Sequence, residues 1–158
     1  MSEKRRFVVL ASVHEAGEAL NQARALERDI KRVYERHFGK RTSVTCIWME
    51  IPQGQAFIAG YPSTASTVLA PVPDDIEQHG REAFMSDMCD LFRVRTDCDV
   101  NEIIVTAMNV SDAKRYAKKA RRRFDPKRAK QTMFQIVARM ILKRPATGYL
   151  KTSLNMPK

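Results

Sequence analysis

The chain has 158 residues, of which 44% are hydrophobic and 29% charged, and its formal net charge is +10. This length suits one domain with a real core, and the two fractions are typical of globular proteins. No apolar run approaches the roughly 20 residues of a membrane-spanning helix, and no cleavage site of a secretory signal follows Met1–Arg6. We therefore expect a cytoplasmic protein with no membrane contact.

The sequence favours neither a disulfide framework nor a metal site. Its cysteines and histidines are Cys46, Cys89, Cys98, His14, His37 and His79. The cysteines form no C-x-x-C pair, and the histidines are isolated in sequence. We expect each histidine to be a surface or helix-end residue, and we expect no metal and no cofactor.

The first part of the chain, residues 7–60, is predicted to form a strand–helix–strand unit. Phe7–Val13 is a short β-branched run typical of a buried strand. Between Glu15 and Phe38 the apolar residues recur at helical spacing, and Gly39 follows as a C-cap. Ser43–Ile51 is a second strand, and proline and glycine at 52 and 54 predict a turn. The intervening helix is long enough for a parallel crossover.

Residues 67–110 repeat this order. Thr67–Val72 is predicted to be a strand, and Asp74 or Asp75 can cap a helix that runs to about Arg95. Glu102–Val110 supplies the fourth strand. Val8 and Val68 lie 60 residues apart, as do Thr45 and Val105, so we expect the two units to superpose in register.

Two such units side by side predict an α/β (α+β) fold, a four-stranded sheet with both helices on one face. The opposite face would carry alternate residues of the second strand. The two alternatives are Thr45, Ile47 and Met49, or Cys46, Trp48 and Glu50. Because the two helices cover the other face, we expect contacts in an oligomer to cover this one.

Residues 111–158 form a basic helical extension of what we expect to be a single domain, residues 1–158. They contain 15 Lys/Arg and two Asp, whereas residues 1–110 contain 13 Lys/Arg and 16 Asp/Glu. Ser111 can cap the first basic segment. A helix over Lys127–Lys143 is predicted to use its apolar stripe for core or subunit contact, and a short strand at Gly148–Ser153 can follow.

The stretch TSVTCIWMEIPQGQAFIAG, from Thr42 to Gly60, resembles the second strand, glycine turn and hairpin of the tautomerase superfamily, the 4-oxalocrotonate tautomerase fold. The fused length and IPQGQAFIAGYPSTASTVLAPV are most similar to the cis-3-chloroacrylic acid dehalogenase group. The resemblance runs from about Phe7 to Val110. It implies a homotrimer and chemistry on 2-oxo acids or their enols, with an amino-terminal proline as base and arginines on the substrate carboxylate.

The same resemblance places other residues at the family's functional positions. Phe7 falls where the proline belongs, and six residues precede it. Thr45 falls at a strand arginine, and Asp74 and Asp75 fall near two helix arginines. Thr106 falls near the dehalogenases' tyrosine, and residues 117–120 fall near their water-activating glutamate. Standard proline-dependent activity is therefore not expected.

Two hypotheses follow. In the first, the chain binds a small anionic, 2-oxo acid-like ligand in the old pocket, whether or not it is an enzyme. Tyr34 stands near the dehalogenases' first-helix histidine, and Phe57 keeps a family-like hydrophobic wall. The candidate pocket residues are Arg5, Arg6, Phe7, Tyr34, Thr45, Phe57, Thr106 and Arg115.

In the second hypothesis, an oligomer grips nucleic acid or another polyanion through its basic extension. Ten Lys/Arg lie between Lys114 and Lys130, and phosphate contacts of this kind give salt-dependent affinity. The candidate residues are Lys114, Arg115, Lys118, Lys119, Arg121, Arg122 and Arg123. Alternatively, these cations can pair with the acidic first part of neighbouring subunits.

Overall fold

The computed structural model describes residues 5–15, 17–121 and 129–153. The first unit consists of β1 (Arg5–His14), α1 (Glu18–Asn21), α2 (Ala23–Phe38) and β2 (Thr42–Ile51). A hairpin follows, made of β3 (Phe57–Ile58) and β4 (Tyr61–Pro62). The second unit consists of β5 (Ser66–Leu69), α3 (Gln78–Thr96), the 3-10 turn η1 (Val100–Glu102) and β6 (Ile103–Thr106). The chain continues with α4 (Val110–Arg121), α5 (Ala129–Thr147) and β7 (Leu150–Ser153).

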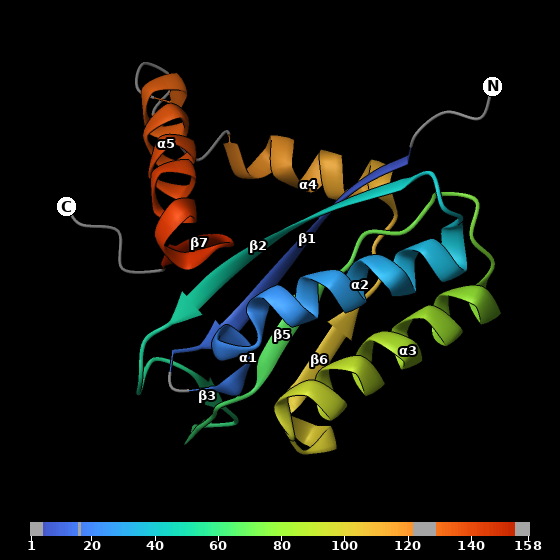
Figure 1. The fold of residues 1–158 in the computed structure, drawn as a ribbon, viewed down its shortest axis with the longest axis horizontal. Helices are drawn as coiled ribbons and strands as arrows, with labels where there is room; N and C mark the ends of the chain where they lie inside the picture. Colours follow the sequence, from blue (N-terminus) through green and yellow to red (C-terminus); the bar gives the residue numbers. More distant parts are fainter. Residues whose placement is uncertain (1–4, 16, 122–128, 154–158) are drawn as a thin grey trace.

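The main sheet has five strands in the order β6-β5-β1-β2-β7. β1 and β2 run parallel, as do β5 and β6, and the two units meet antiparallel where β1 pairs with β5. The α2 and α3 helices lie side by side over one face of the sheet (Figure 1). The predicted α/β fold with two helices on one face is therefore confirmed. A fifth strand, β7, extends the sheet by pairing parallel with β2.

The core lies between this face and the two helices. In β1 the buried side chains alternate with more exposed ones, which is the period of two that a strand with one covered face requires. On α2 the buried residues Leu26, Ile30 and Val33 recur at helical spacing. Removing a large apolar side chain of this kind from water stabilises the fold by about 1.5–3 kcal/mol.

The other face of the sheet is open within the single chain. Cys46 and Trp48 are buried under the helices, so Thr45, Ile47 and Met49 occupy the opposite face. On the open face Val8 is 53% exposed and Ile104 is 46% exposed. Of the two predicted alternatives for this face, the one that contains Thr45 is the observed one.

The two units pair their strands at equivalent positions, as the predicted register requires, but their equivalent side chains point to opposite faces of the sheet. Val8 pairs with Thr45 and Val68 pairs with Val105, as expected. However, Val68 is fully buried whereas Val8 lies on the open face. Since side chains alternate between faces, the 60-residue offset places equivalent pairs on opposite sides of the sheet.

The structure corrects the bounds of two predicted elements. The first helix is interrupted at Gln22, whose ψ of 5° ends α1 and begins α2. The predicted strand over Glu102–Val110 is paired within β6 only for Ile103–Thr106, with an isolated bridge between Val72 and Asn109. Glu102 belongs instead to η1.

The prediction that Asp74 or Asp75 caps the second helix is wrong. A turn closes when the Ile76 N–H donates to the carbonyl of Pro73 at 3.3 Å, so α3 begins only at Gln78. The Asp74 carboxylate instead accepts the backbone N–H of Ser111 in the first turn of α4, at 3.0 Å. This hydrogen bond holds the pKa of Asp74 below its ordinary value, and the nearby charge of Lys114 acts in the same direction.

The C-terminal elements do not form part of the two-helix layer. The α5 helix packs chiefly on β7, at the edge of the sheet opposite β6 (Figure 1). Of its apolar side chains, Phe134 is 75% exposed and Leu142 is 76% exposed. In the part of the chain that the structure describes, no helix combines the length and apolarity needed to cross a bilayer.

Candidate functional site

The position expected to correspond to the family's proline is occupied by a core side chain. Phe7 is 3% exposed, and its ring centroid lies 4.8 Å from that of Tyr34 and 5.7 Å from that of Phe38. Tyr34 is fully buried and donates its hydroxyl to the carbonyl of Pro71 at 2.8 Å. Burial also raises the pKa of Tyr34 far above its ordinary value, so the phenol stays protonated. This aromatic cluster stabilises the core and offers no base at neutral pH.

The other predicted pocket residues are distributed over the molecule. Arg5 and Arg6 are exposed at the start of β1, beside Thr42 and Ser43 of β2. Thr45 is exposed on β2, across from Val8.

The remaining three predicted pocket residues lie on three further elements. Phe57 is 60% exposed on β3, Thr106 ends β6, and Arg115 is exposed on α4 beside Asp112. Of the eight candidates, Phe7 and Tyr34 are the pair that the structure brings into ring contact.

The predicted polyanion-binding residues lie on or after α4. The side chains of Lys114, Arg115, Lys118 and Lys119 are all exposed, and Arg121 is the last residue of the helix. Arg122 and Arg123 lie outside the described residues. Arg115 forms an ion pair with Asp112, three residues earlier on the helix.

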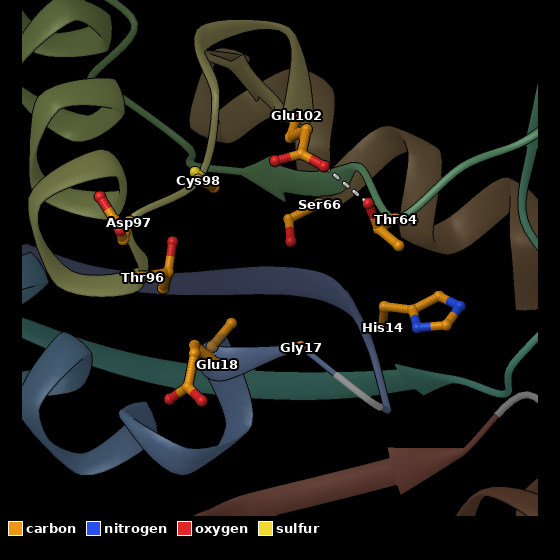
Figure 2. A pocket seen from close by; sticks show the side chains of 10 residues that line it. His14, Gly17, Glu18, Thr64, Ser66, Thr96, Asp97, Cys98 and Glu102 are labelled. Carbon is orange, nitrogen blue, oxygen red and sulfur yellow. Dashed lines mark hydrogen bonds between the residues drawn. The ribbon is translucent and has the colours of Figure 1, made fainter.

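A polar pocket of about 150 Å³ lies where β1 ends, and we call it the His14 pocket. Figure 2 shows the residues that line it, which come from β1, α1, the loop before β5, the end of α3 and η1. His14 is only 6% exposed, so the prediction of a surface or helix-end histidine is wrong for this residue. Its Nδ1 atom is buried without a hydrogen-bond partner among the described residues.

The charge of the His14 pocket disfavours an acidic ligand. Glu18, Asp97 and Glu102 line it, and the C-terminal end of α3 adds negative potential. The Thr64 hydroxyl donates to Glu102 at 2.7 Å, and this bond, with the N–H of Asp99, holds the pKa of Glu102 below its ordinary value. Within the described residues, no group of three or more metal-ligating side chains has a geometry that could hold a metal ion.

A larger cavity of about 300 Å³ has the opposite charge. It lies between α2, residues 44–46 of β2, the end of α5 and the start of β7. We call it the cationic cavity because its lining includes Arg24, Arg28, Lys31 and Arg144 against one carboxylate, Glu27. Thr45 also lines it, so one predicted pocket residue borders this space.

Two further groups in the cationic cavity are fixed by the core. Glu27 accepts the indole N–H of buried Trp48 at 3.0 Å. Burial raises the pKa of Glu27 above its ordinary value, although the bond from Trp48 and the charge of Arg144 partly oppose this effect. Burial also raises the pKa of the Cys46 thiol to about 12, so Cys46 is no nucleophile at neutral pH. The cavity can therefore hold an anion but contains no activated thiol.

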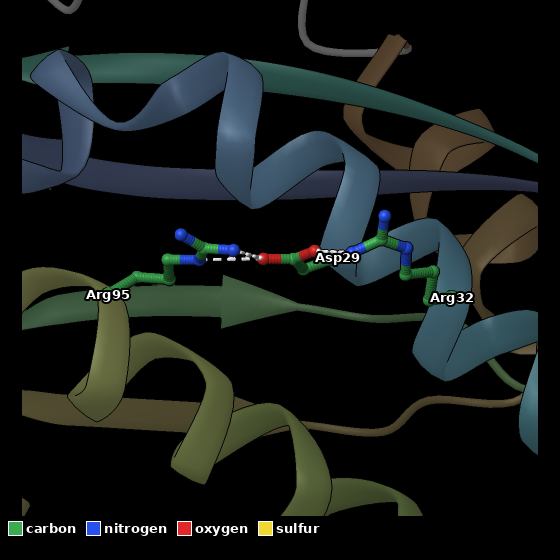
Figure 3. Close-up of polar contacts among 3 residues, drawn as sticks. All are labelled: Asp29, Arg32 and Arg95. Atoms are coloured by element: carbon green, nitrogen blue, oxygen red, sulfur yellow. Dashed lines mark hydrogen bonds and ion pairs between the residues drawn. The ribbon is translucent and has the colours of Figure 1, made fainter.

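An ion cluster centred on Asp29 joins α2 to the end of α3. Asp29 is 9% exposed and accepts from Arg32 at 2.7 Å and from the Nε of Arg95 at 2.6 Å (Figure 3). Side-chain hydrogen bonds of α2 thus reach both the second unit, through Arg95, and the C-terminal elements, through Arg24. This anchoring positions the cationic residues of α2 beside β2.

Comparisons with known proteins define the class of the fold. No protein-family model and no curated protein matches the sequence. Solved structures of the tautomerase superfamily do match, so the predicted tautomerase fold is confirmed. The matched share, 65% of this chain, equals in length the part from β1 to β6.

Three of these structures illustrate the likeness. Native Ps01740 aligns at a TM-score of 0.61 and 20% identity, over 93% of its own chain. A fused 4-OT wild-type symmetric trimer aligns at 0.58 and 13%, over 85% of its chain. N1, a member of the cis-3-chloroacrylic acid dehalogenase family, aligns at 0.58 and 10%, over 74% of its chain. Each comparison covers 65% of the present chain, and at these identities the likeness establishes the fold.

Sequence reasoning missed the cationic cavity. Its signal was available in part, because Arg24, Arg28 and Lys31 recur at spacings of four and three on one helix face. Arg144 lies far away in sequence and reaches the cavity only because β7 pairs with β2. A charged helix face of this kind is ordinary until a tertiary contact closes it into a cavity.

Proposed function

We propose that this chain is a tautomerase-fold protein without proline-dependent chemistry that binds a small anionic ligand. The environment of Phe7 is the observation that supports the absence of proline-dependent chemistry. Its ring has no titratable group, it is buried against Tyr34 and Phe38, and Arg5 and Arg6 continue β1 before it. A base at this position needs an amine of lowered pKa, which a phenyl ring cannot supply.

The neighbouring positions support the same proposal. Thr45 is neutral where the resemblance implies a strand arginine, and Asp74 is engaged with the backbone of α4. Losing a carboxylate clamp together with the base removes both the proton transfer and the charge stabilisation of the family reaction. Each such group typically contributes two or more orders of magnitude to the rate.

The anionic ligand is supported by cations that face solvent. Arg5 and Arg6 are exposed at the start of β1, and four further cations line the cationic cavity. Forked guanidinium groups suit carboxylate and phosphate oxygens, so a 2-oxo acid or a similar small anion fits these surroundings.

The test combines turnover and binding on the purified chain. Enol forms of phenylpyruvate and 2-hydroxymuconate are followed by ultraviolet absorbance, and binding of phenylpyruvate is followed by calorimetry. We expect no ketonisation above the buffer rate, together with measurable binding at low salt. A rate above buffer that disappears in Arg5→Gln or Arg6→Gln would contradict the loss of activity. Absence of phenylpyruvate binding would contradict binding of a small 2-oxo acid-like anion.

We propose a homotrimer as the functional assembly. One of the similar structures is a fused 4-OT symmetric trimer, and the open face of the present sheet exposes apolar side chains such as Val8 and Ile104. Covering such a face between subunits removes it from water. Light scattering at several concentrations should report three chains, and a persistent monomer would overturn this assembly.

The second candidate function is binding of nucleic acid or another polyanion. It is favoured by the exposure of Lys114, Arg115, Lys118 and Lys119 on α4, beside the 62% exposed ring of Tyr116. Duplex DNA and RNA should then bind at low salt and dissociate as salt rises. Lys118→Gln with Lys119→Gln should weaken this binding and reduce its salt dependence, whereas no binding at low salt would remove this function.

A further inference from the structure

The cationic cavity is assembled from two distant parts of the chain. Arg24, Arg28 and Lys31 come from α2, and Arg144 comes from the last turns of α5. Four cations and one carboxylate therefore line a space of about 300 Å³, a volume at the lower end of small-molecule sites. Mutual repulsion makes such a concentration of charge unfavourable unless anions neutralise it.

The four cations differ in how far they are already engaged. Arg24 donates to the carbonyl of Thr147 at 3.5 Å, and Lys31 lies 3.5 Å from Glu35. Arg28 is exposed and has no ion pair or hydrogen bond among the residues that the structure describes. The charge of Arg144 acts on Glu27, whose carboxylate accepts the indole N–H of Trp48. Arg28 and Arg144 thus keep most of their donors for a ligand.

The cavity has a rigid frame. A Cβ added at Gly148 would lie 1.9 Å from the Nε of Arg24, so the absence of a side chain there lets this guanidinium pack against the end of α5. Tyr149 lies edge-on to Trp48 with ring centroids 6.4 Å apart, and Lys151 bonds Glu50 at 2.7 Å. These contacts join α5 and β7 to α2 and β2, so the segments that carry the cations are positioned before a ligand arrives.

We propose that the cationic cavity, and not the position around Phe7, binds the ligand, and that the ligand is a small multiply charged oxyanion of the organic phosphate class. Arg28 and Arg144 hold its oxygens with forked donors, and Lys31 adds a point charge. The proposal rests on the small anionic ligand proposed above. A doubly or triply charged group is favoured because a single carboxylate would leave most of the charge in the cavity unbalanced.

Trp48 supplies the readout. It is the single tryptophan of the chain, it is buried, and its indole N–H bonds to Glu27 in the cavity wall. Inorganic pyrophosphate is the probe, titrated into the full-length protein at low salt while the fluorescence of Trp48 and the heat of binding are recorded. We expect saturable binding that weakens as salt rises.

Two double variants matched in charge locate the site. Arg28→Gln with Arg144→Gln removes two cations from the cavity, and Arg5→Gln with Arg6→Gln removes two from the start of β1. We expect the first pair to weaken pyrophosphate binding by about tenfold or more, because each lost guanidinium removes charge-assisted hydrogen bonds to the oxyanion. The second pair tests the alternative location of the ligand, near Phe7. If the ligand binds in the cationic cavity, this pair should change the affinity less than about twofold, with circular dichroism unchanged in both variants.

The other outcomes separate this inference from the proposed function. If the Arg5 and Arg6 variant alone weakens binding, the ligand lies near Phe7, so the cavity is wrong while small-anion binding stands. Equal weakening by both double variants would mean general attraction to a basic protein and would overturn the cavity. Absence of pyrophosphate binding would also overturn the assignment of the ligand to the cationic cavity. The proposed function is tested separately, by the binding of phenylpyruvate.

Discussion

The two β-α-β units and the C-terminal elements are held together in different ways. Every buried hydrophobic residue of the described chain lies between Phe7 and Ile103. Beyond β6, α5 leaves Phe134 and Leu142 largely exposed. The C-terminal elements are attached through a few contacts, such as the hydrogen bond between Arg24 and Thr147 and the ring contact between Tyr149 and Trp48. The two units, which we call the body, therefore have their own core. The C-terminal elements contribute mainly charge and one wall of a cavity.

The largest expected effect tests this difference with two phenylalanines. Phe84 is fully buried on α3, with ring centroids 5.0 Å from Tyr34 and 5.2 Å from Phe38. Phe84→Ala should lower the free energy of unfolding by about 3–5 kcal/mol. Phe134→Ala on α5, where the side chain is 75% exposed, should change it by less than about 0.5 kcal/mol.

Urea denaturation followed by Trp48 fluorescence measures both variants. A loss at Phe134 as large as that at Phe84 would contradict the comparison, because it would place Phe134 in a buried contact that the single chain lacks. If that loss also varied with protein concentration, the predicted use of the α5 stripe as a subunit contact would gain direct support.

The next effect concerns the ion cluster that joins the two helices of the body. Asp29 is nearly buried between Arg32 and Arg95, so Asp29→Asn removes a charge that two guanidinium groups share. We expect a loss of about 1–2 kcal/mol in the free energy of unfolding, since both arginines can return to water. Glu35→Gln, which removes the surface pair with Lys31, is the control and should cost about 0.3 kcal/mol. Equal losses would show that burial of Asp29 contributes nothing.

A smaller effect tests how the C-terminal elements are attached. Gly148 and Gly39 both have positive φ, at 78° and 92°, so alanine is strained at either position. An added Cβ meets nothing within 4 Å at Gly39 but meets the guanidinium of Arg24 at Gly148. Gly39→Ala should therefore cost about 1 kcal/mol, and Gly148→Ala should cost up to about 1 kcal/mol more because Arg24 must move.

Chemical denaturation compares the two glycine variants, and hydrogen exchange shows where each one acts. Gly148→Ala should accelerate exchange in β7 and the end of α5, whereas Gly39→Ala should act between α2 and β2. Identical stability losses without faster exchange in β7 would mean that the contact between Arg24 and Gly148 does not hold these elements.

Local patterns sufficed for the body of the fold. Periods of two and 3.6 in apolar residues predicted the strands and α2, and Gly39 and Gly54 marked turns with positive φ. The break at Gln22 was missed because the apolar period continues through it. The cap at Asp74 was misassigned because its partner, Ser111, comes from an element 37 residues later, which no local rule detects.

The candidate site depended still more on tertiary structure. The resemblance drew attention to Phe7, whose side chain turned out to belong to the core. The cationic cavity requires Arg144 and Arg28 to line the same space, which follows from β7 pairing with β2. Likewise, the His14 pocket brings buried His14 together with the loop before β5 and the end of α3, which lie far from it in sequence. Charge patterns along a sequence can indicate which residues belong to such sites, but they do not show which of these residues lie close together in the fold.

The smallest expected effect is a pH dependence within the body. Asp87 accepts from His37 and from Arg36, each at 2.9 Å, and these bonds hold its pKa below the ordinary value. A lowered folded-state pKa contributes stability above the unfolded value of about 3.9, and this contribution is lost as pH falls through the folded value. Because Asp87 is partly open to solvent, we expect Asp87→Asn to reduce the stability difference between pH 7 and pH 3 by about 0.5 kcal/mol. Asp90→Asn, on the same helix and 3.6 Å from Arg93, is the matched control in urea titrations at both pH values. An equal change in both variants would assign the effect to net charge, and a contribution from Asp87 that grows at low pH would have the wrong sign for this contact.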